Sequence, residues 1–346
     1  MRDDGSLRSL LEILACPHDR SSLTLASSVL KCQGGHAFPV VDGVPVMLVL
    51  NEQQTHHEAS RSIRDAYFPM LREERNPGPA LNGVDGFVQK SIVLVAGQMY
   101  KPVVGRLKRY PVVNLELPPG NGQLFIDIGC NWGRWSLAAA RLGYRVLGID
   151  PNLEAIRSAQ RIAAAEGVHA DFIVGDGRFL PIKTGVVDFV FSYSVLQHFS
   201  KSDVALTLNE IRRVLGTSGR SLVQMASATG MRNVYQQARR RFREPSGFEV
   251  RYWGRREILE TFSSVIGPTL IRPEAFFGLG IQRTDVSLLP LRYKAIAIAS
   301  DLLRRAAEII PPFARLADSV FVDSQVTFEN PDIQLELKSD VPLFRS

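Results

Sequence analysis

The fold is decided by the stretch Leu124-Phe-Ile-Asp-Ile-Gly-Cys-Asn-Trp-Gly-Arg-Trp135, which is followed by a second apolar run, Val146-Leu-Gly-Ile-Asp150. Apolar residues lead into Asp127, glycine recurs at Gly129 and Gly133, and an alanine-rich run comes next. This order predicts a buried strand, a tight turn and the N-terminus of a helix. Free backbone N–H groups in such a turn bind polar or anionic groups of nucleotide-like ligands. The second strand ends in a carboxylate that can accept both hydroxyls of a ribose, so we expect an adenosine-containing cofactor.

The glycine spacing distinguishes this turn from two other nucleotide-binding loops. The dinucleotide fingerprint G-x-G-x-x-G needs glycines at positions 131 and 134, where this chain has Asn131 and Arg134. A P-loop needs Gly-Lys followed by Ser or Thr at the start of the helix, and the sequence contains no such triplet. What is present is D-x-G-x-N-x-G, which begins at Asp127.

That pattern resembles motif I, [D/E]-x-G-x-G-x-G, of the class I S-adenosylmethionine-dependent methyltransferases. Asn131 replaces the middle glycine, and because asparagine tolerates a left-handed backbone we expect the loop geometry to survive. Residues 172–180, 187–198 and 211–225 fit the later landmarks of the family, in the correct order. The resemblance covers residues 116–228. It implies an α/β fold with a Rossmann-like seven-stranded sheet, S-adenosylmethionine as cofactor and methyl transfer as the activity.

The same resemblance assigns roles to individual residues. The loop would hold the methionine end of the cofactor, the carboxylate after the second strand the ribose, and the acidic residue after the third strand the adenine amino group. The cofactor-binding residues that it implies are Asp127, Gly129, Asn131, Gly133, Asp150, Asp176 and Gly177.

His198 follows the predicted fourth strand, where relatives place the substrate face. A histidine titrates near neutral pH, so we predict that His198 is the general base for a hydroxyl acceptor. The alternative is a positioning or packing role, because many relatives transfer the methyl group by proximity alone.

Residues 7–50 have a different character. They contain Cys16-Pro-His-Asp19, then Cys32-x-x-x-His36, and then the tail Phe38-Pro-Val-Val-Asp-Gly-Val-Pro45. This order resembles the small Trm112-like zinc-binding domains, in which a C-P-x-C knuckle faces a C-x-x-C knuckle. The resemblance implies a structural zinc ion bound by Cys16, Asp19, Cys32 and His36.

The ligand set departs from that pattern, because Asp19 stands where the second cysteine is expected. All four residues are competent zinc ligands, but replacing a thiolate by a carboxylate weakens zinc affinity. His18 is an alternative to Asp19. A ribbon without metal, held by apolar residues alone, is the other interpretation, although a domain this small gains much of its stability from a metal.

Length and composition predict a full-size core plus a smaller unit. The chain has 346 residues, of which 45% are hydrophobic, and a formal net charge of +6. Three cysteines make no disulfide framework, the first residues lead into no apolar signal region, and no run is long enough to span a membrane. We therefore expect a cytoplasmic protein. We expect a Trm112-like domain over residues 1–50, a linker with N-terminal helices over 51–115, and a methyltransferase domain over 116–346 with a cap insertion at about 274–316.

The methyl acceptor is not written in these motifs. The cap and the fused front domain favour O-methylation of a small-molecule, sugar or lipid-linked biosynthetic intermediate. An RNA or protein methyltransferase and a non-catalytic cofactor-binding scaffold are the alternatives. The arginines at 239–241 and 243 are either a solvated helix face or a site for an anionic substrate such as a phosphorylated sugar, a lipid head group or RNA. The insertion helix either packs as a cap or makes peripheral contact with a membrane.

Overall fold

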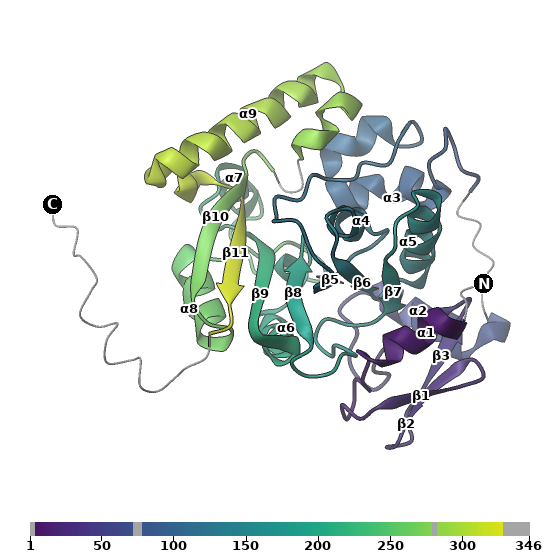
Figure 1. Cartoon of the computed structure of the whole chain (residues 1–346). Coiled ribbons are helices and arrows are strands. Elements are labelled where there is room, and N and C mark those ends of the chain that lie inside the picture. The colour runs from purple at the N-terminus through teal and green to yellow at the C-terminus, as the bar shows by residue number, and fades with distance from the viewer. Residues whose placement is uncertain (1–3, 72–77, 279–281, 328–346) are drawn as a thin grey trace, which may run out of the picture.

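The computed structural model describes residues 4–71, 78–278 and 282–327 and contains two sheets (Figure 1). The larger sheet has seven strands in the order β10-β11-β9-β8-β5-β6-β7. Its strands pair in parallel except β11, which is antiparallel to both β9 and β10. The predicted Rossmann-like sheet of class I methyltransferases is thereby confirmed. Its strands are β5 (Leu124–Ile128), β6 (Arg145–Asp150), β7 (Asp171–Val174), β8 (Val187–Ser192), β9 (Leu215–Ala226), β10 (Thr269–Ala275) and β11 (Ser319–Gln325).

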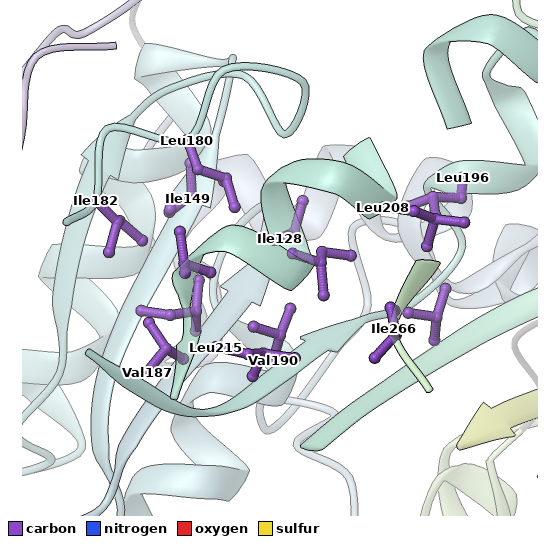
Figure 2. Packing of buried hydrophobic residues seen from close by; sticks show 14 of the residues in the cluster. Ile128, Ile149, Leu180, Ile182, Val187, Val190, Leu196, Leu208, Leu215 and Ile266 are labelled. Atoms are coloured by element: carbon purple, nitrogen blue, oxygen red, sulfur yellow. The ribbon is translucent and has the colours of Figure 1, made fainter. Parts of the chain in front are cut away.

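Helices cover both faces of this sheet, which explains why its central strands are almost continuously apolar. Alternate residues of β5 face opposite sides: Ile126 and Ile128 belong to one buried cluster, and Phe125 belongs to another with Trp135. Figure 2 shows part of the first cluster, in which Ile128 of β5 lies beside Val190 of the neighbouring β8. The helices around the sheet are α4 (Arg134–Arg141), α5 (Leu153–Ala165), α6 (Lys201–Val214) and α8 (Arg255–Val265).

The N-terminal part forms the smaller, antiparallel sheet after α1 (Asp4–Leu11). It is built onto the edge of the larger sheet: the Met47 N–H donates to Val174 O (2.8 Å), and the Ala15 N–H donates to Pro181 O (3.1 Å). The apolar side chains of both parts merge into one buried cluster. The small sheet therefore covers β7, which would otherwise be an open edge. Its strands are β1 (Leu23–Ala26), β2 (Val29–Cys32), β3 (Ala37–Val41) and β4 (Val44–Pro45).

Two helices connect this small sheet to β5. They are α2 (His57–Tyr67) and α3 (Gly86–Ala96), with short 3-10 turns at η1 (Pro69–Leu71) and η2 (Gln98–Val103). Ser62 of α2 fixes the linker to the large sheet, because its Oγ lies 2.7 Å from Pro151 O and accepts the Leu153 N–H at 2.9 Å. The linker thus crosses the carboxyl end of β6, beside the predicted cofactor site.

The C-terminal part contains η3 (Leu196–His198), α7 (Met231–Arg239), η4 (Arg283–Leu288), α9 (Leu291–Ile309) and η5 (Pro311–Leu316). From the sequence we expect the two terminal strands at 265–272 and 320–328. The first begins later, at Thr269, because α8 continues to Val265 and Gly267 (φ +139°) ends that segment in a conformation that other residues rarely adopt. Phe328, the last residue of the second expected strand, lies outside the described residues. Over the part of the chain that the structure describes, no helix is long and apolar enough to cross a membrane.

Candidate functional site

The turn after β5 has the left-handed backbone that its sequence predicts. Gly129, Asn131 and Gly133 have φ values of +76°, +48° and +85°. The Gly129 N–H donates to Ile149 O (2.7 Å), which ties the turn to β6. A Cβ on Gly129 would lie 2.1 Å from a methyl carbon of Val195, so only glycine fits against the loop after β8. The retained loop geometry confirms the expectation for the Asn131 replacement.

Asp150, at the carboxyl end of β6, is fixed by two backbone donors. Its Oδ2 accepts the Asn131 N–H and its Oδ1 accepts the Asn152 N–H, both at 2.9 Å. Each carboxylate oxygen retains a lone pair, so the group can still accept two hydroxyl protons. Burial raises the pKa of Asp150 to about 6, and the charge of Glu58 raises it further against the two N–H donors, which lower it. A ligand that donates hydrogen bonds here favours the ionised form.

Asp127 lies one layer deeper and is fully buried. Its carboxylate accepts the Ser136 hydroxyl at 2.6 Å, which joins the end of β5 to the first turn of α4. Burial raises the pKa of Asp127 to about 7, and the neighbouring charge of Asp150 acts in the same direction. The carboxylate therefore orients the helix behind the loop, and its role toward the methionine end of a cofactor stays a prediction.

Asp176 and Gly177 follow β7. Arg178 forms an ion pair with the carboxylate of Asp176. Its Nη2 lies 2.7 Å from Oδ2, and its Nε lies 3.2 Å from each of the two oxygens. Arg178 also donates to Gln53 O (2.8 Å) in the linker. An adenine amino group would have to share Asp176 with this guanidinium, so its role toward adenine stays a prediction. A Cβ on Gly177 would lie 2.9 Å from Ile128, so close packing accounts for a glycine at this position.

His198 ends the 3-10 turn after β8. Its Nδ1 lies 2.8 Å from Phe248 O, and its ring stacks on the Phe248 ring with centroids 4.1 Å apart. That carbonyl accepts only from a protonated Nδ1, so in the neutral ring Nε2 carries the lone pair. Burial lowers the pKa of His198 to about 4, helped by the charge of Arg251. His198 is therefore an unprotonated imidazole at neutral pH, ready to accept a proton but weakly basic.

His198 lines a cavity of about 970 Å³ together with Ser194 and Gln197. Ser194 directly precedes Val195, the residue that packs against Gly129, so the cavity begins beside the motif I loop. In a sheet of this order the crevice for ligands lies where neighbouring strands lead in opposite directions, here between β5 and β8. The opposite walls come from the α3–η2 segment and from α7 with the chain that follows it. Five arginines line the cavity: Arg232, Arg239, Arg240, Arg241 and Arg243.

The four predicted metal ligands meet at one point. The ligand atoms of Cys16, Asp19, Cys32 and His36 all lie within 4.8 Å of one another. His36 Nδ1 is 3.3 Å from Cys32 Sγ, 3.5 Å from Cys16 Sγ and 3.2 Å from Asp19 Oδ2. Zinc–ligand bonds of about 2.0–2.3 Å at tetrahedral angles place neighbouring ligand atoms roughly 3.3–3.8 Å apart. The cluster has the spacing of a four-ligand site.

The alternative ligand, His18, lies outside that cluster. Its ring stacks on the His36 ring with centroids 4.2 Å apart and an interplanar angle of 7°. It therefore covers one of the predicted ligands, and the geometry favours Asp19 over His18.

The structure also joins residues that the sequence did not connect. Arg134, at the start of α4, donates to Asp285 of η4, and so does the hydroxyl of Tyr100 in η2. All three side chains are buried. Arg134 directly follows the last glycine of the loop. A charged residue at a position expected to be buried is the one sequence signal that could have indicated a buried ion pair here. Nothing in the local sequence marks Asp285.

Comparisons with known proteins bear on two parts of the chain. Residues 125–219 match the family model described as a methyltransferase domain. The chain carries a methyltransferase domain. It is 31% identical over 114 residues to a ubiquinone biosynthesis O-methyltransferase of Azorhizobium caulinodans, covering 33% of this chain and 44% of that protein. The chain thus spans less than half the length of this relative.

Two further matches concern a short segment and the fold. The chain is 46% identical over 44 residues to a UPF0434 protein of a Marinomonas species, covering 12% of this chain and 68% of that protein. Over this segment the chain belongs to the UPF0434 family. A solved structure of a S-adenosylmethionine-dependent methyltransferase from Methanosarcina mazei is 20% identical, with a TM-score of 0.43 over 62% of this chain and all of that one.

Proposed function

We propose that the chain is an S-adenosylmethionine-dependent methyltransferase that acts on an oxygen atom of a small-molecule or lipid-linked intermediate. The observation that carries the proposal is Asp150, held by two backbone donors beside a left-handed glycine turn at the carboxyl edge of the sheet. This arrangement offers paired acceptors for ribose hydroxyls, beside a glycine turn that lets the rest of the cofactor approach the backbone closely. The matched methyltransferase domain supports the same cofactor.

The residues present fit this cofactor chemically. S-adenosylmethionine supplies an already activated methyl group, so the protein mainly orients the reactants and excludes water. Asp150 would hold the ribose, the turn from Gly129 to Gly133 the methionine end, and the loop around Asp176 and Gly177 the adenine. Val195, packed on Gly129, places the loop after β8 beside that turn. The acceptor would therefore enter from the cavity lined by Ser194 and His198.

His198 would then take the proton of a hydroxyl acceptor as the methyl group is transferred. Its neutral state at pH 7 and its Nδ1–H bond to Phe248 O leave Nε2 as the acceptor atom. The relative from Azorhizobium is named for O-methylation in ubiquinone biosynthesis, which agrees with oxygen as the receiving atom. The volume of the cavity suits a small molecule, since ligand pockets usually enclose about 300–1,000 Å³.

We also propose that the N-terminal unit is a Trm112-like domain with a structural zinc ion bound by Cys16, Asp19, Cys32 and His36. The spacing of the four ligand atoms supports this, and the short UPF0434 match suits so small a unit. A thiolate-containing metal site is stable where thiols stay reduced, which supports a cytoplasmic location. The metal would stabilise the fold and take no part in methyl transfer.

Calorimetric titration tests the proposed activity. The purified, zinc-replete protein is titrated with S-adenosylmethionine and with S-adenosylhomocysteine, with NAD as the control ligand. Micromolar binding of the first two and no binding of NAD is the expected result. If neither sulfur compound binds to a folded sample, the scaffold alternative replaces the enzyme.

A further inference from the structure

The cavity beside His198 is strongly basic on one side. Among the described residues, five arginines line it, from α7 and the chain that follows, against one lining carboxylate, Glu249. Arginine stays protonated at every pH that a protein survives. A concave wall with this surplus of positive charge attracts and orients anions. The positive charge therefore lines the candidate acceptor site. This position favours an anion-binding role over a helix face that is merely solvated.

The arginines differ in how far they are already engaged. Arg243 forms an ion pair with Glu249 (2.6 and 2.7 Å), so its charge is largely neutralised. Arg240 lies over the Tyr252 ring and donates from Nη1 to Val250 O (3.0 Å). Its Nε is buried, and among the residues that the structure describes no group accepts that N–H. A buried donor without a partner is costly, so the described neighbours of Arg240 leave its hydrogen bonding incomplete.

Arg239 and Arg241 flank Arg240 and are exposed at the cavity wall. No ion pair or hydrogen bond joins either side chain to another residue within the described ranges. Arg241 has a left-handed backbone (φ +56°), which turns the chain at the end of α7. All three arginines line the same cavity, and the side-chain donors of Arg239 and Arg241 are unengaged among the described residues. Planar guanidinium forks match phosphoryl oxygens in pairs, which a lysine or an amide cannot do.

We propose that this wall binds a phosphoryl group, as a monoester or a diphosphate, carried by the methyl acceptor. The inference rests on the methyltransferase function proposed above. The phosphoryl end would lie against Arg239, Arg240 and Arg241, and the oxygen to be methylated would lie at the other end of the cavity, near His198. Residues of the α3–η2 segment line the opposite wall, so a small anionic group would lie between two walls.

Calorimetry with inorganic pyrophosphate as the probe tests the proposal on the full-length protein. Citrate serves as a carboxylate anion of similar charge, and S-adenosylhomocysteine is titrated in parallel as a check on the cofactor site. We expect pyrophosphate to bind at least tenfold more tightly than citrate. The double variant Arg239→Gln/Arg241→Gln should weaken pyrophosphate at least tenfold and leave S-adenosylhomocysteine binding unchanged. Because both side chains are exposed, this variant should fold, and circular dichroism checks that it does.

Arg256→Gln is the matched control, because Arg256 is an exposed arginine of α8 that pairs with Glu260 and is not among the described residues that line the cavity. It should leave pyrophosphate binding as in the wild type. Equal binding of citrate and pyrophosphate, or equal loss in the control and the double variant, would overturn the proposal as unspecific charge attraction. Binding of a single-stranded RNA that pyrophosphate does not displace would also overturn it, in favour of a nucleic-acid substrate.

Two outcomes separate this inference from the proposed function. If S-adenosylhomocysteine binds and pyrophosphate does not, the phosphoryl site is wrong and the methyltransferase stands. If pyrophosphate binds and S-adenosylhomocysteine does not, the anion site is real but the acceptor assignment fails with the enzyme. Vesicles with and without phosphatidic acid then identify the source of the phosphoryl group: binding only to the anionic vesicles, lost in the double variant, indicates a lipid-borne acceptor, and no vesicle binding indicates a soluble one.

Discussion

Replacing Asp150 by asparagine should separate cofactor binding from stability. The pKa of Asp150 is raised from its ordinary 3.8 to about 6, which is roughly 2 units, or about 3 kcal/mol at 1.36 kcal/mol per unit. Because the folded-state pKa is raised, the protonated carboxyl favours the folded state. This contribution to the free energy of unfolding is fully present below about pH 3.8 and is lost as the pH rises through about 6. Above that pH, the ionised Asp150 therefore destabilises the folded state of the protein without cofactor.

The Asp150→Asn variant removes that pH-dependent loss but introduces an amide donor. One of the two N–H groups, of Asn131 or Asn152, then faces an NH₂ group and loses its acceptor, at a cost of about 1–3 kcal/mol. At about pH 8 the two effects nearly cancel, and the empty variant should be as stable as the wild type or up to about 2 kcal/mol more stable. The ribose meanwhile loses a charged acceptor worth about 1.5–3 kcal/mol, which is a roughly 10- to 150-fold weaker affinity.

The assay pairs urea unfolding of the empty protein at about pH 5.5 and about pH 8 with titration of S-adenosylhomocysteine at the same pH values. The variant-minus-wild-type difference is the quantity to compare, and it includes the relief of Asp127, whose pKa the charge of Asp150 raises. Asp188→Asn is the control: Asp188 also accepts a backbone N–H, from Leu124 at 2.7 Å, but at the amino end of the strands. Unchanged cofactor affinity in Asp150→Asn, or an empty variant less stable than the wild type by more than about 1 kcal/mol at pH 8, would refute the reasoning.

Three further predictions test the rest of the site. His198→Gln should lower kcat about 10²- to 10⁴-fold if His198 is the general base. Because the pKa of His198 is about 4, the wild-type rate should not fall on acidification through this group above about pH 5. An unchanged kcat excludes the role. Cys32→Ser should lose the bound zinc, measured by elemental analysis of the purified protein, and lower its melting temperature; a wild type purified without zinc contradicts the site. Asp285→Asn should cost about 3–5 kcal/mol in urea unfolding, because it leaves Arg134 buried without its ion-pair partner, whereas Glu260→Gln, which removes an exposed ion pair with Arg256 on α8, should cost under about 1 kcal/mol.

The sequence was sufficient wherever a function depends on local backbone. Gly129, Asn131 and Gly133 have positive φ in the structure because a strand must turn into a helix there within a few residues, and that need is visible in the residue types. The ends of the parallel strands follow from their apolar runs. The order of strands in the sheet follows from the family resemblance rather than from any one segment.

The sequence was insufficient wherever function depends on distant partners. Arg178 lies only two residues from Asp176, yet its second contact is Gln53 O, far away in the chain. The stacking of Phe248 on His198 depends on how residues 240–250 fold back, and no pattern of apolar residues predicts that path. For the same reason the position of His198 after the fourth strand was predictable, but its depressed pKa was not, because burial is a property of the assembled cavity.

The N-terminal unit has a structural consequence for the catalytic part. Val46 pairs with Val174 as an added parallel bridge, so the small sheet ends by extending the large one beyond β7. The chain then continues past Gln53, which accepts Arg178, to Ser62, which contacts the turn after β6. Both contacts reach loops that follow the carboxyl ends of β6 and β7, where the cofactor is expected. A metal bound at the small sheet would therefore stabilise the unit from which this linker leaves, and through it the loops where the cofactor is expected.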